Sequence, residues 1–583
     1  MSMVLNEATA DAEAPPSSSE MPMAQGARDI RLGALALTVR GRVWQTPARD
    51  RRFVGYAALV VAAAVVFGTW ATGFNPWAAL TGLGPLVEFV AQDFLPPEVN
   101  NWTVLLRAVL DTAALALTST LVASALAFVA ALFGAKAISP LPWLSPIIRG
   151  FATFVRNVPD LVWAVILVSA LGVGTHVGFA ALTLSSFAFL TRAFIESMDE
   201  ISGDSVEALS AVGASFPQRV VQAIIPPFTK DYIAWFLYNL EVSIRGATIV
   251  GMVGGGGIGM LLNAQMRNFR WFPRATGTIL VLAALVIAVD LLTSYLRNKL
   301  LSPAASVSGR ESRHDDDGAL FRRGRLLVHQ PGRDLAVRLF MWASIAVSLA
   351  AFWPLNINWD SLFGRAYRLG STFVQLGALN FMHWGPTWNA FLETVAVAVL
   401  STFYSALLAL MIAPFAARNL AGNRAVPLFI TSIATFIRTI PNPVIVLIAI
   451  SSFGLGPVPG VVGLTLSSTA FFVRAFAQGF EDVSADTIEA LQATGANRLQ
   501  VYFQGVMPAS RSHLVAWTGM RFEMNFMGSA ILGMVGAGGI GAEILRATNG
   551  RQLGVAGVGI LLVFLFAFAF EQLLTRIKRN YIR

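Results

Sequence analysis

The stretch Glu207 to Pro226, EALSAVGASFPQRVVQAIIP, recurs 282 residues later as EALQATGANRLQVYFQGVMP, from Glu489 to Pro508. Both copies are polar interruptions in a chain that consists mainly of long apolar segments, so we expect each to be a loop exposed to water. We refer to them as the first helical loop and the second helical loop. Their recurrence at matched positions indicates a duplicated unit.

Within each helical loop, the residue spacing predicts two short helices joined by a glycine. An acidic residue three positions before the first glutamate can cap a helix, and a glycine is suited to the left-handed turn at the helix end. The expected caps are Asp204 and Asp486, the turn glycines are Gly213 and Gly495, and the second helices run from Ser215 or Asn497 to Pro226 or Pro508. A solvated helical hairpin would explain one copy, but two matched copies favour a docking surface for a partner.

The composition indicates a polytopic membrane protein. Of the 583 residues, 55% are hydrophobic and 13% are charged, and the mean hydropathy is +0.63, which is too apolar for an average soluble domain. The net charge of +9 comes mainly from arginine. In membrane proteins such charge collects in cytoplasmic loops, so we do not expect nucleic acid as a partner. With no cysteine and only five histidines without ligand spacing, the sequence predicts neither a metal site nor a catalytic residue.

A shift of 282 residues aligns the two halves of the chain from about residue 51 to the C-terminus. Between 182–214 and 464–496, 18 of 33 positions are identical, which a shared apolar composition alone would not produce. The sequence therefore predicts two tandem domains related by a pseudo-twofold axis. The expected segments are an N-terminal tail at 1–50, a first domain at 51–301 with its core at 102–300, a linker at 302–332, and a second domain at 333–583 with its core at 384–583.

Each half contains six apolar segments of about 20 residues, the length that a helix needs to cross a bilayer. We therefore expect an all-α fold with about 12 spans, and both termini on one side, because six is an even number. In the first half the spans are expected near 53–71, 104–134, 150–171, 177–198, 232–254 and 276–297. In the second half they are expected near 336–353, 386–416, 433–453, 459–480, 514–536 and 558–579.

The placement of arginine predicts which side is cytoplasmic. Several arginines precede the first span, whereas the loop 71–103 has no lysine or arginine, and basic residues collect on the cytoplasmic side. This rule places both termini, both helical loops and the linker in the cytoplasm. Residues 1–27 lack the basic start and apolar core of a cleavable signal, so the first span is expected to direct insertion.

One glycine motif follows the fifth span of each half. The motifs are GMVGGGGIG at 251–259 and GMVGAGGIG at 533–541. Both contain G-x-G-x-x-G, but neither has the preceding strand or the later acid that a dinucleotide site requires. Two interpretations remain open: close packing of helices, or a gate whose backbone N–H groups face a pathway. The gate candidates are Gly254, Gly256, Gly536 and Gly538.

Arg156 and Arg438 occupy matched positions, each three residues before a proline near the third span. An arginine at mid-membrane costs roughly 2.5–3.5 kcal/mol on insertion scales, so it must reach the interface, pair, or line a cavity. Two interpretations follow: both arginines extend to lipid headgroups, or both face each other across a central pathway for an anion. Glu241 and Glu523, in the fifth spans, are possible salt-bridge partners.

The helical loops resemble the cytoplasmic loop by which permease subunits of ATP-binding-cassette importers engage their ATPase. Ala223 and Gly505 depart from that pattern, which usually has a larger aliphatic residue there. The segments RNVPDLVWAVILV, LTLSSFAFLTRAF and IRGATIVGMVGGGGIG are most similar to phosphonate importers. The resemblance implies two fused permease domains of the type I importer fold. The matching coupling residues are Glu207, Ala208, Gly213, Pro226, Glu489, Ala490, Gly495 and Pro508.

The resemblance also implies partners and a cellular location. It predicts two ATPase subunits, one extracytoplasmic substrate-binding protein, a phosphonate-like anion as cargo, and a bacterial cytoplasmic membrane. The chain has no G-x-x-x-x-G-K-[ST] motif, so ATP and Mg²⁺ are expected on a separate ATPase and no cofactor in this chain. Two alternatives remain: an importer permease for another small solute, and a secondary transporter with two six-helix repeats, for which matched docking loops would have no purpose.

Overall fold

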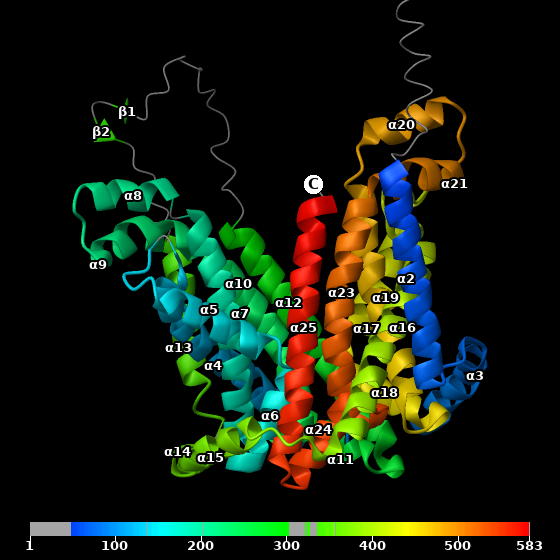
Figure 1. Ribbon diagram of the computed structural model, residues 1–583, viewed down its shortest axis with the longest axis horizontal. Coiled ribbons are helices and arrows are strands. Elements are labelled where there is room, and N and C mark those ends of the chain that lie inside the picture. Colours follow the sequence, from blue (N-terminus) through cyan, green and yellow to red (C-terminus); the bar gives the residue numbers. More distant parts are fainter. Residues whose placement is uncertain are drawn as a thin grey trace, which may run out of the picture. The chain divides into compact units, whose positions relative to one another are not determined.

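The computed structural model describes residues 48–136, 138–201, 203–301, 321–322, 325–326, 335–355 and 357–581. Most of the expected tail and linker lies outside these residues. The chain divides into two units, Met1–Ala64 and Val65–Arg583, and the features discussed below belong to the second. The described chain is helical apart from one pair of two-residue strands, which confirms the predicted all-α class (Figure 1).

The first half contains long helices and several short ones. The label η marks short non-α helices: η1 and η2 are π-helical turns, and η3, like η5 in the second half, is a 3-10 helix. These elements are α2 (Ala48–Thr72), α3 (Pro76–Asp93), α4 (Trp102–Gly134), α5 (Leu144–Arg156), α6 (Asp160–Leu171), α7 (Thr175–Ile201), α8 (Gly203–Ala211), α9 (Phe216–Arg219), η1 (Val220–Ile224), α10 (Ile225–Val250), η2 (Gly251–Gly255), α11 (Gly257–Met266), η3 (Phe269–Trp271) and α12 (Phe272–Leu301). The antiparallel strands β1 (Phe321–Arg322) and β2 (Arg325–Leu326) follow.

The second half repeats this order, with π-helical turns at η6 and η7. Its elements are α13 (Leu335–Ala350), α14 (Trp359–Gly364), α15 (Ala366–Gly377), η5 (Phe381–His383), α16 (Trp384–Ala416), α17 (Ala425–Thr439), α18 (Asn442–Phe453), α19 (Pro457–Glu481), α20 (Ala485–Ala493), α21 (Arg498–Val501), η6 (Tyr502–Val506), α22 (Met507–Ala509), α23 (Arg511–Leu532), η7 (Gly533–Ala537), α24 (Gly539–Asn549) and α25 (Leu553–Tyr581).

The described part of the chain contains slightly fewer candidate membrane spans than the sequence predicts. Within the described residues, six helices are long and apolar enough to cross a membrane, and five bent helix pairs raise the total to at most 11. The difference from 12 is the span expected at 336–353. The apolar part of α13 in the described range is Leu339–Ala350, and at 1.5 Å per residue this is shorter than the roughly 30 Å hydrocarbon core.

The third span of each half is a sharply bent helix pair, which corrects the expectation of single helices at 150–171 and 433–453. α5 meets α6 at 90°, and α17 meets α18 at 88°. Each break falls at a proline, Pro159 or Pro441, which caps the second helix of the pair. Proline has no N–H and disfavours the helical conformation in the residue before it, so it ends one helix and starts the next.

The fifth span of each half is broken at its glycine motif. α10 is bent by 60° against α11, and α23 is bent by 60° against α24. Gly254 and Gly536 have φ angles of 107° and 114°, which residues with a side chain rarely adopt. The glycines therefore allow the membrane helix to change direction.

Hydroxyl groups at equivalent positions satisfy the backbone at these two breaks. The N–H of Ile258 donates to Thr112 Oγ1 at 2.7 Å. The N–H of Ile540 donates to Thr394 Oγ1 at 2.8 Å. Because each pair is separated by 146 residues and the two pairs are related by the 282-residue shift, the duplication seen in the sequence is reproduced in hydrogen bonds.

Two segments that were expected as extramembrane loops are helical and interlock the halves. α3 lies within 71–103, and α14 and α15 occupy the equivalent place in the second half. α3 packs against α18 of the second half, and α15 packs against α6 of the first. Arg365 strengthens the second contact, since its Nη1 donates to the carbonyl of Leu171 at the end of α6 at 2.9 Å.

The largest hydrophobic cluster is also shared between the halves. It combines Val162 and Trp163 of α6 with Phe526 and Ala530 of α23 and Ile560 of α25. The two halves therefore bury a common apolar surface in addition to their own clusters. Such a shared core keeps the halves associated independently of the linker.

The Thr394 hydroxyl should contribute measurably to stability. Thr394→Val keeps the side-chain shape but leaves the buried N–H of Ile540 without an acceptor, which costs about 1–3 kcal/mol. We expect a lower thermal unfolding midpoint for the purified protein in detergent. Thr118→Val is the matched control, because Thr118 is also fully buried but bonds only to carbonyls of its own helix. Equal midpoints for the two variants would argue against the proposed stabilisation.

Candidate functional site

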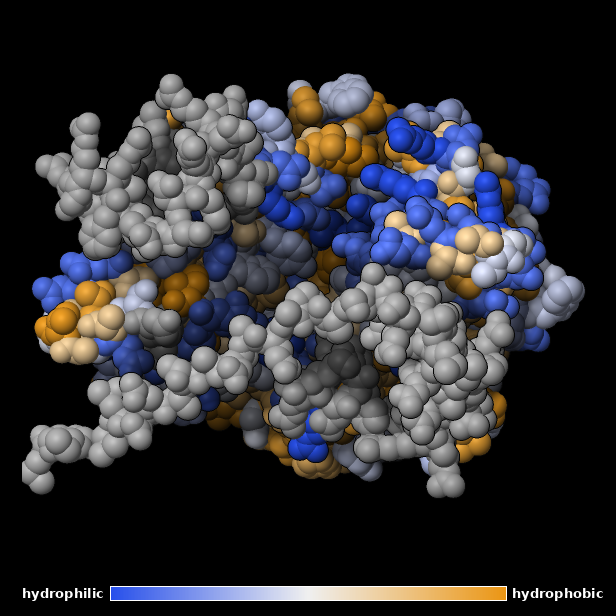
Figure 2. Space-filling model, turned by 90° about the horizontal axis from the view of Figure 1, so that it is seen from above, coloured by the Kyte–Doolittle hydropathy of each residue, from blue (hydrophilic) through white to orange (hydrophobic). Residues whose placement is uncertain are grey.

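Both helical loops lie at the same end of the unit Val65–Arg583, α8 and α9 in one and α20 and α21 in the other (Figure 1). Figure 2 views this end from above, where hydrophobic patches interrupt a mostly hydrophilic surface. Four apolar side chains of the loops are largely exposed: Val212 at 78%, Val221 at 59%, Leu499 at 66% and Phe503 at 60%. Exposed apolar groups on a polar face are typical of protein docking surfaces.

The turn in each loop has the predicted left-handed glycine. Gly213 has a φ of 79° and Gly495 a φ of 82°. In the first loop the N–H of Ala214 donates to the Leu209 carbonyl at 3.0 Å, and the equivalent bond in the second loop measures 3.3 Å. These bonds satisfy carbonyls at the end of the first short helix, so the turn is fixed by its own backbone.

The predicted helix starts are only partly correct. α20 begins after Ser484 and α8 begins at Gly203, so Asp486 and Asp204 lie inside the first turn and not at the caps. An acidic residue in that turn is favoured by the helix dipole instead. Asn497 caps α21 as predicted. Its side-chain oxygen accepts from the N–H of Gln500 at 2.9 Å, and the side-chain oxygen of Gln500 accepts from the N–H of Asn497 at 2.8 Å.

The prolines do not end the loop helices, contrary to the sequence prediction. α9, η1 and α10 form one continuous helical path from Phe216 to Gly255, with Pro226 in the first turn of α10. In the second loop, η6 leads into α22, which contains Pro508, and α23 begins after one further residue. A π-helical turn before each proline accommodates the lost hydrogen bond and the ring. Each loop therefore leads directly into a membrane helix.

The loops are anchored on one face and exposed on the other. Val206 and Ile488 are buried against the membrane helices. Gly505 leaves room for Leu491, which a Cβ at that position would strike, so this departure from the family pattern has a packing reason. Burial raises the pKa of Tyr502, whose hydroxyl donates to a carbonyl of α16 at 3.0 Å. The predicted coupling residues Glu207, Ala208, Glu489 and Ala490 are exposed.

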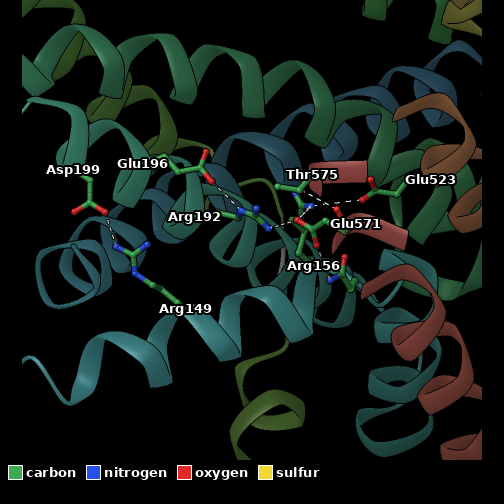
Figure 3. A network of polar contacts seen from close by, with 9 residues as sticks. Arg149, Arg156, Arg192, Glu196, Asp199, Glu523, Glu571 and Thr575 are labelled. Atoms are coloured by element: carbon green, nitrogen blue, oxygen red, sulfur yellow. Dashed lines mark hydrogen bonds and ion pairs between the residues drawn. The ribbon is translucent and has the colours of Figure 1, made fainter. Parts of the chain in front are cut away.

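Arg156 ends α5 and joins a network of ion pairs with the second half (Figure 3). Its Nη2 donates to Glu571 at 2.9 Å and lies 3.6 Å from Glu523. Glu571 also accepts from Arg192 Nη1 and, at 3.2 Å, from the side-chain amide of Asn157. The carboxylate of Glu571 is 9% exposed. It thus holds two arginines of the first half against α25 of the second.

Arg438 has a different environment although it is the counterpart of Arg156. The residue equivalent to Glu571 in the first half is Val289. Among the described residues, no carboxylate lies within 4.0 Å of the Arg438 guanidinium, which instead lies 5.9 Å from the ring centre of Phe471. Arg438 lines a cavity of about 1050 Å³ within the second half. That it faces Arg156 across a pathway stays a prediction.

A second cavity of about 510 Å³ lies between the halves, next to the glycine breaks. It combines apolar walls from both halves with a few polar groups. Gly254 is among the residues that line it. The principal apolar residues are Val165, Ile249, Met252, Val253, Met534 and Val535, and the polar residues include Asn263, Arg267, Thr548 and Asn549.

The other predicted gate glycines mainly allow close packing. A Cβ on Gly256 would strike Thr175, and one on Gly538 would strike Glu393. The N–H of Gly539 donates to Glu393 at 3.0 Å, so this group at the break is already occupied by a protein carboxylate. The geometry therefore supports the packing interpretation at these positions and leaves Gly254 beside the cavity.

Sequence reasoning missed Glu571 and Arg192 as members of the ion-pair network. The 282-residue shift aligns Arg192 with Arg474 but Glu571 with Val289. This loss of a carboxylate in one half is the signal that could have identified the different environments of Arg156 and Arg438. Glu393 is the acidic counterpart of Asp111 at the same shift, but its bond to the backbone at the glycine break was not predicted. Charges that differ between otherwise matched positions mark where the halves diverge.

No metal chemistry is evident in the described ranges of the chain. No three histidine or acidic side chains come together there in a way that could hold a metal ion. The groups available for ligand binding are guanidinium groups, amides and backbone N–H groups, which suit an anion.

The comparisons with known proteins agree with this architecture. Residues 123–302 and 405–583 each match the model of a binding-protein-dependent transport system inner membrane component. The chain is 27% identical over 512 residues to the phosphate-import permease protein PhnE of Mycolicibacterium smegmatis, covering 88% of this chain and 92% of the relative. It is 29% identical to the phosphite transport system permease protein PtxC of Stutzerimonas stutzeri, covering 42% of this chain and 89% of that one.

A further relative is named for a different substrate. The glycine betaine transport system permease protein OpuAB of Bacillus subtilis is 29% identical and covers 33% of this chain and 66% of its own length. The fold and the paired loops define a multi-pass membrane permease with two equivalent halves. The chain belongs to the family of binding-protein-dependent transport system inner membrane components, whose model it contains twice.

Removing the Glu571 charge should loosen the contact between the halves. Glu571→Gln leaves Arg156 and Arg192 without their shared carboxylate, and because both arginines are about a third exposed we expect a loss of about 1–3 kcal/mol, less than for a fully buried pair. The thermal unfolding midpoint in detergent measures it. Gln572→Ala, an exposed position on the same helix, is the control. A Glu571→Gln midpoint equal to that of the control would show that the network does not stabilise the fold.

Proposed function

We propose that this chain supplies both permease domains of an ATP-binding-cassette importer that passes a phosphorus oxyanion, such as a phosphonate, phosphite or phosphate, into the cytoplasm. The observation that carries the proposal is the pair of helical loops at one end, each leading into a broken membrane helix. Similarity to permeases named for phosphate and phosphite supports the cargo class. Each half would be one permease domain, at 51–301 and 333–583.

The presence of two equivalent loops supports two partner subunits. One ATPase subunit would bind each loop through Glu207 to Pro226 or Glu489 to Pro508, with ATP and Mg²⁺ held on the ATPases. One extracytoplasmic binding protein would deliver the cargo at the opposite end. The loop end, both termini and the linker would then be cytoplasmic, in agreement with the arginine-rich segments on that side.

Movement of the loops would be coupled to the cavity between the halves. A loop that moves with its ATPase carries the helix that follows it, and in the first half that helical path reaches Met252 beside the cavity before it breaks at Gly254. Drawing the loops together on ATP binding would change the spacing of Met252 and Met534 in the cavity wall, and hydrolysis would reset it. Arg438 and Gly254 would line the pathway, and Arg156 and the glycines at 256, 536 and 538 would shape it by setting how closely the surrounding helices pack.

The turn glycines offer a direct test of coupling. Gly495→Arg, alone or with Gly213→Arg, should abolish transport and ATPase stimulation while the chain still inserts, because both positions have open space around them but require a positive φ. Gly370→Arg is the control, at an exposed glycine with open space and an ordinary φ at the other end of the fold. Normal uptake by a well-expressed double variant would remove the coupling role.

The cargo class can be tested in proteoliposomes that contain the chain, its ATPases and its binding protein. We expect ATP-dependent uptake of labelled methylphosphonate that unlabelled phosphite or phosphate reduces and glycine betaine does not. The measured quantity is the initial uptake rate. Competition by glycine betaine alone would point to another solute, and uptake driven by an ion gradient without ATP would favour a secondary transporter.

A further inference from the structure

The second half contains a cavity whose charge has no counterpart in the first. It measures about 1050 Å³, and four of its lining residues are arginines: Arg418, Arg424, Arg438 and Arg474. Glu481 is its one acidic lining residue. We refer to it as the arginine cavity.

In the equivalent region of the first half, the arginines are paired with carboxylates. Arg149 reaches Asp199 at 2.6 Å there, and the position equivalent to Arg149 in the second half is Thr431. The first-half counterparts of Arg438 and Arg474, Arg156 and Arg192, both bind Glu571. In the second half the shorter threonine leaves space, and the carboxylate that would bind the two arginines is missing.

The arginines of the cavity have little compensation from protein groups. Among the described residues, no carboxylate lies within 4.0 Å of any of the four guanidinium groups; Glu481 accepts a bond from the backbone N–H of Arg418, at 2.8 Å. Arg474 Nη1 donates to the hydroxyl of Thr435 at 3.1 Å. These bonds leave most guanidinium donors available for a ligand.

Charges on the packed helices do not remove the excess. Glu241 and Asp290 interact with Arg438 at longer range, but Glu241 is paired with Arg245 at 3.0 Å. Arg521 is 7% exposed and lies behind Phe471, with its guanidinium carbon 4.9 Å from the ring centre. Arg521 replaces the neutral Asn239 of the first half. A further buried arginine therefore contacts Phe471, which lines the cavity.

We infer that the arginine cavity binds a phosphorus oxyanion at the loop end of the second half only. Guanidinium groups match the geometry of phosphoryl oxygens and bind them through paired hydrogen bonds. The cavity is larger than such a small anion, so water fills the remaining volume and binding is reversible. The inference rests on the proposed function for the identity of the anion as released cargo; a phospholipid headgroup shares the same chemistry.

The test measures binding directly, in the assembled complex of the chain with its ATPase subunits in phosphatidylcholine nanodiscs. Methylphosphonate and inorganic phosphate are titrated by calorimetry. Arg418→Gln with Arg424→Gln should weaken binding roughly tenfold or more, because each removes a charged hydrogen-bond partner. Lys136→Gln is the matched control, since Lys136 is the exposed first-half counterpart of Arg418, and it should leave binding unchanged.

A second variant tests the cavity by filling it. Thr431→Arg would place a guanidinium group where it can reach Glu481, as Arg149 reaches Asp199, so the fold already contains a precedent for the arrangement. We expect this variant to lose anion binding while its thermal unfolding midpoint stays at or above the wild-type value. Unchanged affinity in both the Thr431→Arg and the arginine variants, or absence of saturable binding to the wild type, would overturn the inference.

The source of the phosphoryl group is distinguished by lipid composition. Nanodiscs that contain phosphatidylglycerol should leave methylphosphonate binding unchanged if the free anion is the ligand. Loss of that binding, with phosphatidylglycerol retained by the wild type but not by the arginine variants in native mass spectrometry, assigns the same site to a lipid headgroup. Uptake is measured separately: a complex that binds methylphosphonate but does not transport it would contradict the proposed function and leave the site intact.

Discussion

The hydrogen bonds from Ile258 and Ile540 to the hydroxyls of Thr112 and Thr394 make the rest of the fold possible. A membrane interior contains no water to satisfy a backbone group, so a helix can break there only where protein supplies a partner. Each threonine lies on the long second span of its half and supports the break at the glycine motif. The break turns the chain along the cavity between the halves, and a straight helix in this place would leave no wall of glycine and methionine there.

The same requirement explains the arrangement of the shorter helices. The prolines at the corners of α5/α6 and α17/α18 lack the N–H that would otherwise need a partner, and Arg365 supplies a donor to the free carbonyl of Leu171. π-helical turns play the corresponding role at the helical loops, where they carry the helix past Pro226 and Pro508. The helical loops are therefore joined to the fifth spans by continuous hydrogen-bonded helix. Such a connection is stiff, and it transmits a displacement better than a flexible hinge would.

The features that depend on local spacing could be predicted from the sequence, and those that depend on distant contacts could not. The 282-residue repeat, the left-handed glycines and most spans follow from spacing and apolar length. The bend at Pro159 was missed because a span length alone does not distinguish a straight helix from a pair. Asp486 was predicted as a cap from its three-residue spacing to Glu489, but Ser484, two residues earlier, is the observed cap. The environment of Arg156 depends on Glu571, 415 residues away, and only the mismatch with Val289 hinted at it.

Glu571 occurs in the second half only, since its first-half equivalent is Val289, and this asymmetry has a further consequence. In a permease built from two copies of one polypeptide, any substitution appears twice, so a glutamate here would face both arginine pairs or neither. Joining the halves in one chain removes that restriction. One side can keep a carboxylate that fastens two arginines while the other side leaves its arginines uncommitted. Fusion thus does more than fix the stoichiometry of the two halves: it allows the two sides of a single permease to change independently.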